Sequence, residues 1–210
     1  MSVTIHTEKT KVMLMYEGES YQAEVEEIRG CTRCNLHSCR TNIVIYRGNP
    51  RSNIMVIGEA PGSEEDRTGK PFVGPTGSYF VEQMARCGLS LKDYYITNTL
   101  LCRPPNNDDP KREQLDACEE WLYKQIRAVK PQYIIAAGRY ALARLDPAFS
   151  VDHGRITSEE GKPRTPPQLR GAVVIPVRHP SAARRNPDLM AGYERMLSDV
   201  VARIREDRPF

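Results

Sequence analysis

The sequence predicts an α/β protein, a single-domain α/β/α sandwich in which helices cover both faces of a central, mainly parallel sheet. Four short and mainly apolar runs recur along the chain, as expected of strands buried on both faces, at residues 54–57, 94–97, 133–137 and 173–177. Between them lie longer segments whose apolar residues recur every three or four positions, as in amphipathic helices. Strands that alternate with helices in this way build parallel, doubly wound sheets.

The first helix is expected at residues 21–29, and the second is expected to begin near Gly77, where apolar residues follow at helical spacing. A third helix is expected to begin at Pro110 with Asp109 as its N-cap, because proline fits the first helical position. Its apolar face should bury Cys118.

Two further helices are expected at residues 139–145 and 187–204. The stretch 146–171 between them is rich in proline, glycine and charged residues, and we expect a long loop there with a short edge strand at 154–157.

The length of 210 residues and a hydrophobic content of 40% allow one good core and are small for two domains. We therefore expect an N-terminal extension at residues 1–20 and a single domain at 21–210. The first residues lack the apolar run of a secretory signal, and no apolar run reaches membrane-spanning length. The protein is expected to be cytoplasmic, with no membrane partner and with reduced cysteines. A net charge of +3 permits a polyanionic partner without requiring one.

Four cysteines form the most informative pattern in the chain. Cys31 and Cys34 make a C-x2-C pair, and Cys102 and Cys118 follow far downstream with fifteen residues between them. Four thiolates can hold either a tetrahedral zinc ion or a cubane iron–sulfur cluster, and the softness of sulfur does not separate the two. The second pair is not C-x2-C, so an ordinary zinc ribbon fits poorly.

Three loops with distinctive residues follow predicted strands: Gly58–Gly62 after the first, Asn98 after the second, and Arg178–Ser181 after the last. Ligands of doubly wound sheets bind at the carboxyl ends of the strands, so these loops should meet at one site. Taken singly, each has a simpler interpretation as a tight turn, a cap or an exposed loop. The glycines match neither the dinucleotide nor the P-loop pattern.

In order along the chain, these blocks resemble the family 4 uracil-DNA glycosylases, and the resemblance spans roughly residues 21–205. The blocks are Gly58-Glu59-Ala60-Pro61-Gly62, Glu65-Asp66, Gly69-Lys70-Pro71-Phe72-Val73-Gly74, Asn98, Cys102-Arg103-Pro104-Pro105 and His179-Pro180-Ser181.

The resemblance implies a DNA repair glycosylase with a uracil-DNA glycosylase-like fold. Such an enzyme flips uracil out of DNA, hydrolyses its N-glycosidic bond and leaves an abasic site. It implies that Glu59 and His179 are catalytic, that Phe72 stacks on uracil and that Asn98 reads the base edge. The pocket would also be lined by Gly58, Glu59, Ala60 and Glu65, with Glu65 beside the position of a thymine methyl group.

It further implies a 4Fe-4S cluster on Cys31, Cys34, Cys102 and Cys118. The partner would be uracil-containing DNA, single- or double-stranded, bound by a monomer. We expect DNA contacts from the segment after the last strand, namely Arg178, Ser181, Arg184 and Arg185.

Two other hypotheses belong to different classes. One is a catalytically silent iron–sulfur module that binds nucleic acid in a replication or phage assembly. The other is a zinc-stabilised hydrolase of small nucleosides, which the basic segment disfavours. The chain departs from the family pattern at Thr76, Leu101 and Asp108, and after His179-Pro180-Ser181 it lacks the bulky apolar residue that enters the base stack. That role is expected to fall to Arg184 or to a residue elsewhere in the chain.

Overall fold

The computed structural model describes residues 22–152 and 154–206, so the predicted extension at 1–20 lies outside the described residues. The described strands form one sheet of order β1-β3-β2-β4-β5. Its four longer strands β2 (Ile54–Gly58), β3 (Tyr95–Asn98), β4 (Tyr133–Ala137) and β5 (Val173–Val177) are parallel, as predicted. The short strand β1 (Arg47–Gly48) pairs antiparallel with β3 at one edge.

Alternate residues of each parallel strand are buried on opposite faces of the sheet. In β2, for example, Met55 and Ile57 join one core, whereas Ile54 and Val56 join the other. This alternation explains why the strands are apolar throughout, since neither face meets water. Two separate cores result, one on each side.

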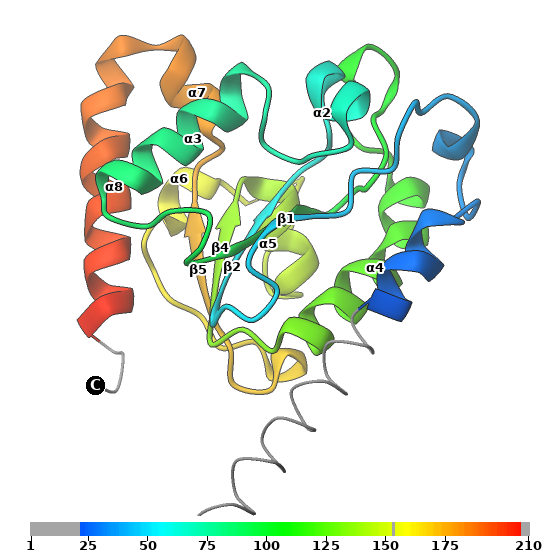
Figure 1. Ribbon diagram of the computed structural model, residues 1–210. Coiled ribbons are helices and arrows are strands. Elements are labelled where there is room, and N and C mark those ends of the chain that lie inside the picture. Colours follow the sequence, from blue (N-terminus) through cyan, green and yellow to red (C-terminus); the bar gives the residue numbers. More distant parts are fainter. Residues whose placement is uncertain (1–21, 153, 207–210) are drawn as a thin grey trace, which may run out of the picture.

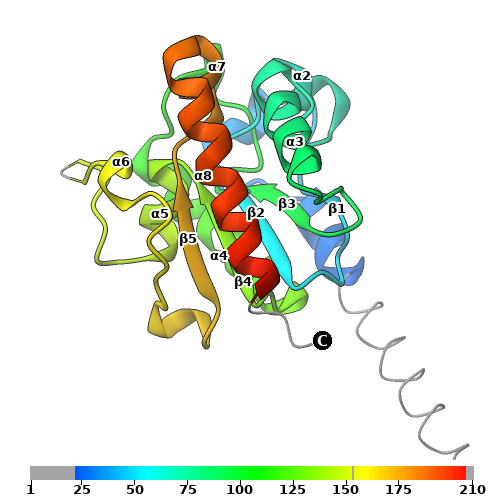
Figure 2. The same cartoon turned by 90° about the vertical axis from the view of Figure 1, so that its left-hand side faces the viewer.

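Helices cover both faces (Figures 1 and 2). On one side lie the helix at residues 22–29, α4 (Arg112–Val129) and α5 (Arg139–Leu145). On the other lie α3 (Pro75–Arg86), α7 (Pro180–Arg185) and α8 (Pro187–Glu206). The predicted α/β/α sandwich is confirmed.

The connections hold further short elements that the sequence patterns did not indicate. They are α2 (Ser63–Thr68), α6 (Ile156–Glu159), and the 3-10 helices η1 (Asn35–Ser38), η2 (Pro105–Asn107) and η3 (Pro167–Leu169). No described helix is both long enough and apolar enough to cross a membrane.

Two local predictions were wrong. Helix α4 begins at Arg112, two residues later than expected, because Lys111 is extended and its N–H donates to the Gln114 side chain at 3.0 Å. That amide, rather than Asp109, closes the first turn. The predicted edge strand at 154–157 is absent from the described residues. The helical turn α6 lies there, and Arg164 makes the isolated bridge to Val174 of β5.

The carboxyl ends of the parallel strands point toward the upper end of the molecule in Figure 1, where α2 and α7 follow β2 and β5. All three predicted loops emerge at this end, and so does the start of α5 after β4.

Candidate active site and cysteine pocket

A cleft of about 640 Å³ opens at the carboxyl ends of the strands, which is within the usual size range of small-molecule sites. It brings together most of the predicted site residues: Glu59, Ala60, Glu65, Phe72, Asn98, Arg178, His179, Ser181 and Arg185. Gly58 and Arg184 are not among its lining residues. One site therefore draws on the loops after β2, β3 and β5.

Gly58 is needed for the close approach of two lining residues. A methyl group on its Cα would lie 2.4 Å from Asn98 Oδ1 and 2.6 Å from Phe72 Cζ, both far inside van der Waals contact. The same strand ends are tied together by backbone bonds, since Thr99 N–H donates to Gly58 O at 2.9 Å. The missing side chain of Gly58 thus makes room for the floor of the cleft.

Asn98 ends β3 and its side chain is 3% exposed. No described residue shares a hydrogen bond with its amide group. Asn98 lines the cleft, and neither of its amide atoms is among the fully buried side-chain atoms that lack a partner, so the amide faces the cleft and is available to pair with a ligand.

Phe72 is held in place by its neighbours on both sides. Its φ of 57° is in the left-handed region, its carbonyl accepts from Arg47 Nη2 at 2.8 Å, and its ring contacts Phe80 at a centroid distance of 5.5 Å. A left-handed phenylalanine costs free energy unless its surroundings hold it. Arg47 was not predicted to belong to the site.

Glu65 ties the two loops of the cleft wall together. Its carboxylate accepts from the backbone N–H groups of Gly62 at 3.1 Å, Val73 at 3.0 Å and Gly74 at 2.7 Å. Charged acceptors make strong bonds of this kind. The carboxylate lines the cleft, but its oxygen atoms already accept hydrogen bonds from the backbone next to Phe72.

Glu59 follows β2 directly and is half-buried. Burial raises its pKa from 4.5 to about 7, the Asp109 carboxylate pushes in the same direction, and the Arg139 guanidinium opposes the shift. Arg139 in turn pairs with Asp109 at 2.7 Å. A carboxyl group with a pKa near neutrality can change protonation state at working pH.

His179 is the N-cap of α7, and its imidazole is tied to the residue two positions on. Nδ1 accepts from the Ser181 backbone N–H at 3.4 Å and lies 2.7 Å from Ser181 Oγ. This arrangement leaves the proton of the neutral ring on Nε2. Desolvation, aided by the positive charge of Arg185, lowers the pKa of His179 to about 4. The ring is therefore a neutral donor at pH 7. Gly138, at a φ of 103°, allows the β4 loop to pass directly beside it.

The predicted DNA-binding arginines differ in their availability. Arg178 makes a two-pronged ion pair with Glu160, with both nitrogen–oxygen distances at 2.6 Å. Arg184 and Arg185 are exposed, and neither pairs with a described acidic residue. The guanidinium groups near the cleft that have no acidic partner among the described residues are therefore those of Arg184 and Arg185 at the end of α7.

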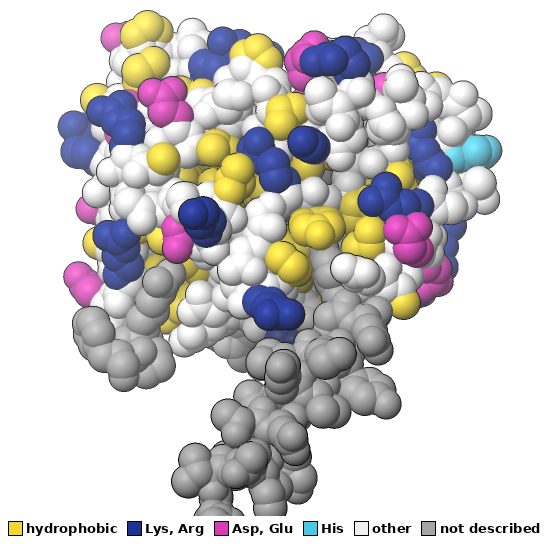
Figure 3. Space-filling model, viewed as in Figure 1, with side chains coloured by type: hydrophobic (Ala, Val, Ile, Leu, Met, Phe, Trp, Pro, Cys, Tyr) yellow, Lys and Arg dark blue, Asp and Glu magenta, His cyan; other side chains and the backbone are white. Residues whose placement is uncertain are grey.

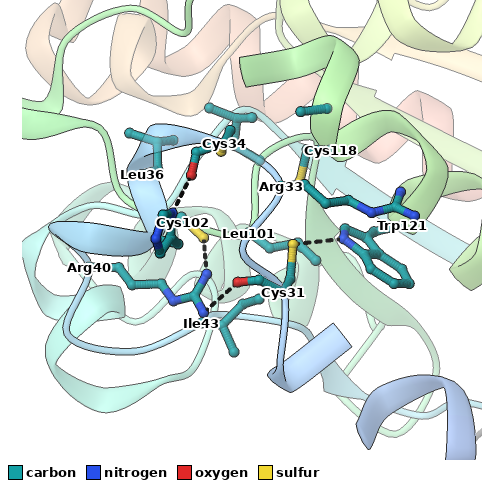
Figure 4. Close-up of a pocket in the computed structure, with 13 residues that line it drawn as sticks. Cys31, Arg33, Cys34, Leu36, Arg40, Ile43, Leu101, Cys102, Cys118 and Trp121 are labelled. Carbon is teal, nitrogen blue, oxygen red and sulfur yellow. Dashed lines mark hydrogen bonds between the residues drawn. The ribbon is translucent and has the colours of Figure 1, made fainter. Parts of the chain in front are cut away.

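The four predicted cysteines line a second pocket, between the helix at 22–29, the loop after β3 and α4 (Figure 4). Figure 4 shows their sulfur atoms facing a common space. Cys102 and Cys118 are buried, and Cys31 and Cys34 are half-buried. Apolar side chains complete the wall, among them Leu36, Ile43, Leu101 and Trp121.

Two side chains donate hydrogen bonds to sulfur in this pocket. Arg40 Nη1 lies 3.1 Å from Cys102 Sγ, and Trp121 Nε1 lies 3.0 Å from Cys31 Sγ. Burial raises the pKa of Cys102 to about 11 and that of Cys118 to about 12, so these thiols need a bound cation to ionise. Among the described residues, no three His, Cys, Asp or Glu side chains converge closely enough for a single metal ion. The four cysteines instead surround a shared space.

Among the cleft residues that the sequence did not indicate are Arg139 and Asp109, which lie close to Glu59. Arg139 opens α5 after β4, and Asp109 lies on the loop between Cys102 and α4. Gly138 and Arg139 directly follow the predicted strand 133–137, and this fourth strand end could have indicated that Arg139 lies at the site.

Comparisons with known proteins agree with this geometry. A family model for the uracil DNA glycosylase superfamily matches residues 45–203. The type-4 uracil-DNA glycosylase of Archaeoglobus fulgidus is 40% identical over 177 residues, which cover 84% of this chain and 89% of that protein. The type-4 enzyme of Thermotoga maritima is 40% identical over 173 residues, covering 82% and 88%. That of Sulfurisphaera tokodaii is 35% identical over 190 residues, covering 90% and 84%. The chain therefore belongs to the uracil DNA glycosylase superfamily and, within it, to the type-4 family.

Proposed function

We propose that this protein is a uracil-DNA glycosylase of base excision repair, which flips uracil out of DNA and hydrolyses its N-glycosidic bond. The observation that carries the proposal is the convergence of Glu59, Asn98 and His179 on one cleft, where the side chains of Glu59 and Asn98 have no hydrogen-bond partner among the described residues. The names of the type-4 relatives support the same activity.

In this proposal Asn98 selects the base. Its amide offers one acceptor for uracil N3–H and one donor for O4, whereas cytosine presents the reversed pattern. Because Asn98 is buried and has no described partner, a ligand that failed to pair with it would leave polar groups unsatisfied. Phe72 would stack against the ring, and Glu65 would hold the Phe72 loop close enough to the base to crowd a thymine methyl group.

His179 and Glu59 would carry the bond cleavage. The leaving uracil gains negative charge at a carbonyl oxygen, which the Nε2–H of neutral His179 stabilises by a hydrogen bond. A neutral imidazole can donate this hydrogen bond from Nε2 because Nδ1 accepts from the Ser181 N–H. Glu59, when ionised, would orient the attacking water or stabilise the positive charge that develops on the sugar.

We propose that Cys31, Cys34, Cys102 and Cys118 hold a 4Fe-4S cluster. A cubane offers each thiolate its own iron, which suits four sulfurs around a shared space better than a single zinc ion does. The cluster would be structural, because it joins the loop before α4 to the segment that follows the helix at 22–29. The rest of the domain at 21–210 would enclose it.

DNA would lie across the cleft and contact the segment after β5, with Arg184, Arg185 and Ser181 as phosphate contacts and Arg178 as a weaker one because Glu160 holds it. Figure 3 shows basic side chains at the upper edge of this face, with acidic side chains beside those near α2. We expect a monomer that acts in the cytoplasm on single- or double-stranded DNA.

The test is to incubate the purified protein with a uracil-containing oligonucleotide and to cleave abasic sites with alkali. Release of uracil by the wild type and loss of release by Asn98→Ala, with unchanged oligonucleotide binding, is the expected result. A wild type that binds DNA but leaves no abasic site would favour the silent binding module. Cleavage of free deoxyuridine alone would favour the nucleoside hydrolase.

A further inference from the structure

One exposed hydrophobic side chain is not accounted for by the residues above. Among the described residues, Leu189 is the large hydrophobic that is exposed, with 37% of its surface open. It lies in the first turn of α8 and lines the same cleft as His179 and Arg185. A single exposed leucine is common on protein surfaces, but one at the mouth of a binding cleft is placed to meet a ligand.

The segment directly after His179 cannot supply a large apolar side chain to the DNA. Ala183 is completely buried against the second core, and Ala182 has only a methyl group. Arg184 is exposed but does not line the cleft. If α7 offers no apolar side chain, the nearest candidate on the chain is Leu189.

Leu189 is held on a rigid support. Asn186 starts the helix, because its Oδ1 accepts from Asp188 N–H at 3.0 Å and its carbonyl accepts from Leu189 N–H at 3.0 Å. One turn and two turns further on, Tyr193 and Leu197 are fully buried in the second core. The exposure of Leu189 is therefore fixed by the fold and does not come from a loose end.

Extruding a base leaves a gap in the stack that water fills poorly. Apolar side chains inserted at base steps replace part of the lost stacking contact, and nearby cations fix the phosphates on either side. Leu189 beside Arg185 combines both requirements. The demand is greatest in a duplex with a well-paired uracil and is small in single-stranded DNA, where the base is already accessible.

We propose that Leu189 is the wedge that enters the duplex when uracil leaves the stack. This inference rests on the proposed glycosylase activity and adds the residue that makes duplex DNA a substrate. Leu189 is a positioning residue, since it would touch the neighbouring bases and not the bond that breaks.

The experiment compares single-turnover excision from three substrates: single-stranded uracil, a U·G duplex and a U·A duplex. For Leu189→Ala we expect the ratio of the U·A rate to the single-strand rate to fall about tenfold, with a smaller fall for U·G. Leu189→Met should restore the ratio. Met190→Ala is the matched control, because Met190 follows directly on the same helix, is half-buried and does not line the cleft.

A second readout follows flipping without chemistry. With 2-aminopurine beside the uracil, unstacking raises fluorescence, and Leu189→Ala should reduce that rise in the duplex. An unchanged ratio together with unchanged fluorescence would overturn the wedge assignment. So would an equal loss on all three substrates, which would indicate a structural role. If the wild type released no uracil even from single strands, the proposed function itself would fail, which is a different result.

Discussion

The cysteine pocket and the cleft share one loop but differ in how completely their polar groups are paired. Asn98 and Cys102 are four residues apart after β3, and one faces the cleft while the other faces the cysteine pocket. In the cysteine pocket, Arg40 and Trp121 donate to sulfur, and apolar side chains close the wall. In the cleft, the side chains of Asn98 and Glu59 have no described hydrogen-bond partner.

The difference separates a site built for stability from one built for a ligand. Satisfied polar groups in an apolar enclosure fix a structure, whereas unpaired polar groups that line an open cleft stay available to pair with a ligand. The short loop between the two sites also means that damage to the cysteine pocket should reach the floor of the cleft.

The largest effect is expected from the cysteine pocket. Cys118→Ser should abolish iron binding and reduce the yield of folded protein by more than about tenfold, because the segments that the proposed cluster would join are far apart in sequence. Iron content, visible absorption and thermal unfolding measure the effect, and the wild type should be brown. Cys39→Ser is the matched control, since Cys39 is exposed and does not line the pocket. A colourless but fully folded wild type would contradict the cluster.

A smaller but still large effect is expected in the cleft. His179→Ala should lower the single-turnover excision rate by about 10²–10³ and leave DNA binding nearly intact, because the lost donor acts where charge develops. Ser181→Ala should lower the rate less, since the backbone N–H of residue 181 still holds Nδ1. Weakened binding with an unchanged saturated rate would instead make His179 a DNA clamp.

The pH dependence of stability should reveal the shifted pKa values of Glu59 and His179. Glu59 has a raised pKa of about 7, so the native state keeps a proton that the unfolded state loses above 4.5, and stability falls as pH rises from 4.5 to 7. His179 has a lowered pKa of about 4, so stability rises from pH 4 to 6.5. The two trends oppose each other between pH 4.5 and 6.5.

Glu59→Gln should remove the falling trend and expose a rise in unfolding free energy over that range, on the order of 1–3 kcal/mol. His179→Ala should leave only the trend caused by Glu59, a fall in unfolding free energy as the pH rises over the same range. The charged neighbours are Asp109 and Arg139 for Glu59, and Arg185 for His179. Denaturant titrations from pH 4 to 8 measure both. If Glu59→Gln left the curve unchanged, the unpaired, desolvated state of Glu59 would be refuted.

The smallest effect is expected at the rim of the cleft. Arg185→Ala should flatten the dependence of log binding constant on log salt by about 0.9 on duplex DNA, the contribution of one phosphate contact. Arg178→Ala should change the slope less, because Glu160 already pairs with that guanidinium. Equal changes at both positions, measured by fluorescence anisotropy, would show that DNA displaces Glu160.

The sequence by itself determined the parallel strands, the longer helices and the strand-end loops. The parallel strands are apolar on both faces, so their pattern is strong and local. The four cysteines and the residues at the ends of β2, β3 and β5 could be named for the same reason, as short motifs at fixed spacing. The start of α4 was misplaced because a side-chain cap by Gln114 competes with the signal of Pro110.

Only the tertiary structure decided which of these residues are available for chemistry. In the sequence Arg178 and Glu65 look like free charged groups. In the structure Arg178 forms an ion pair with Glu160, and Glu65 accepts hydrogen bonds from three backbone N–H groups. Arg139 and Leu189 read as ordinary helix residues, yet folding brings them to the cleft. Pairing, burial and the resulting pKa shifts depend on contacts between segments far apart in sequence. No local pattern encodes such contacts, so the roles of these residues emerge only when the chain is folded.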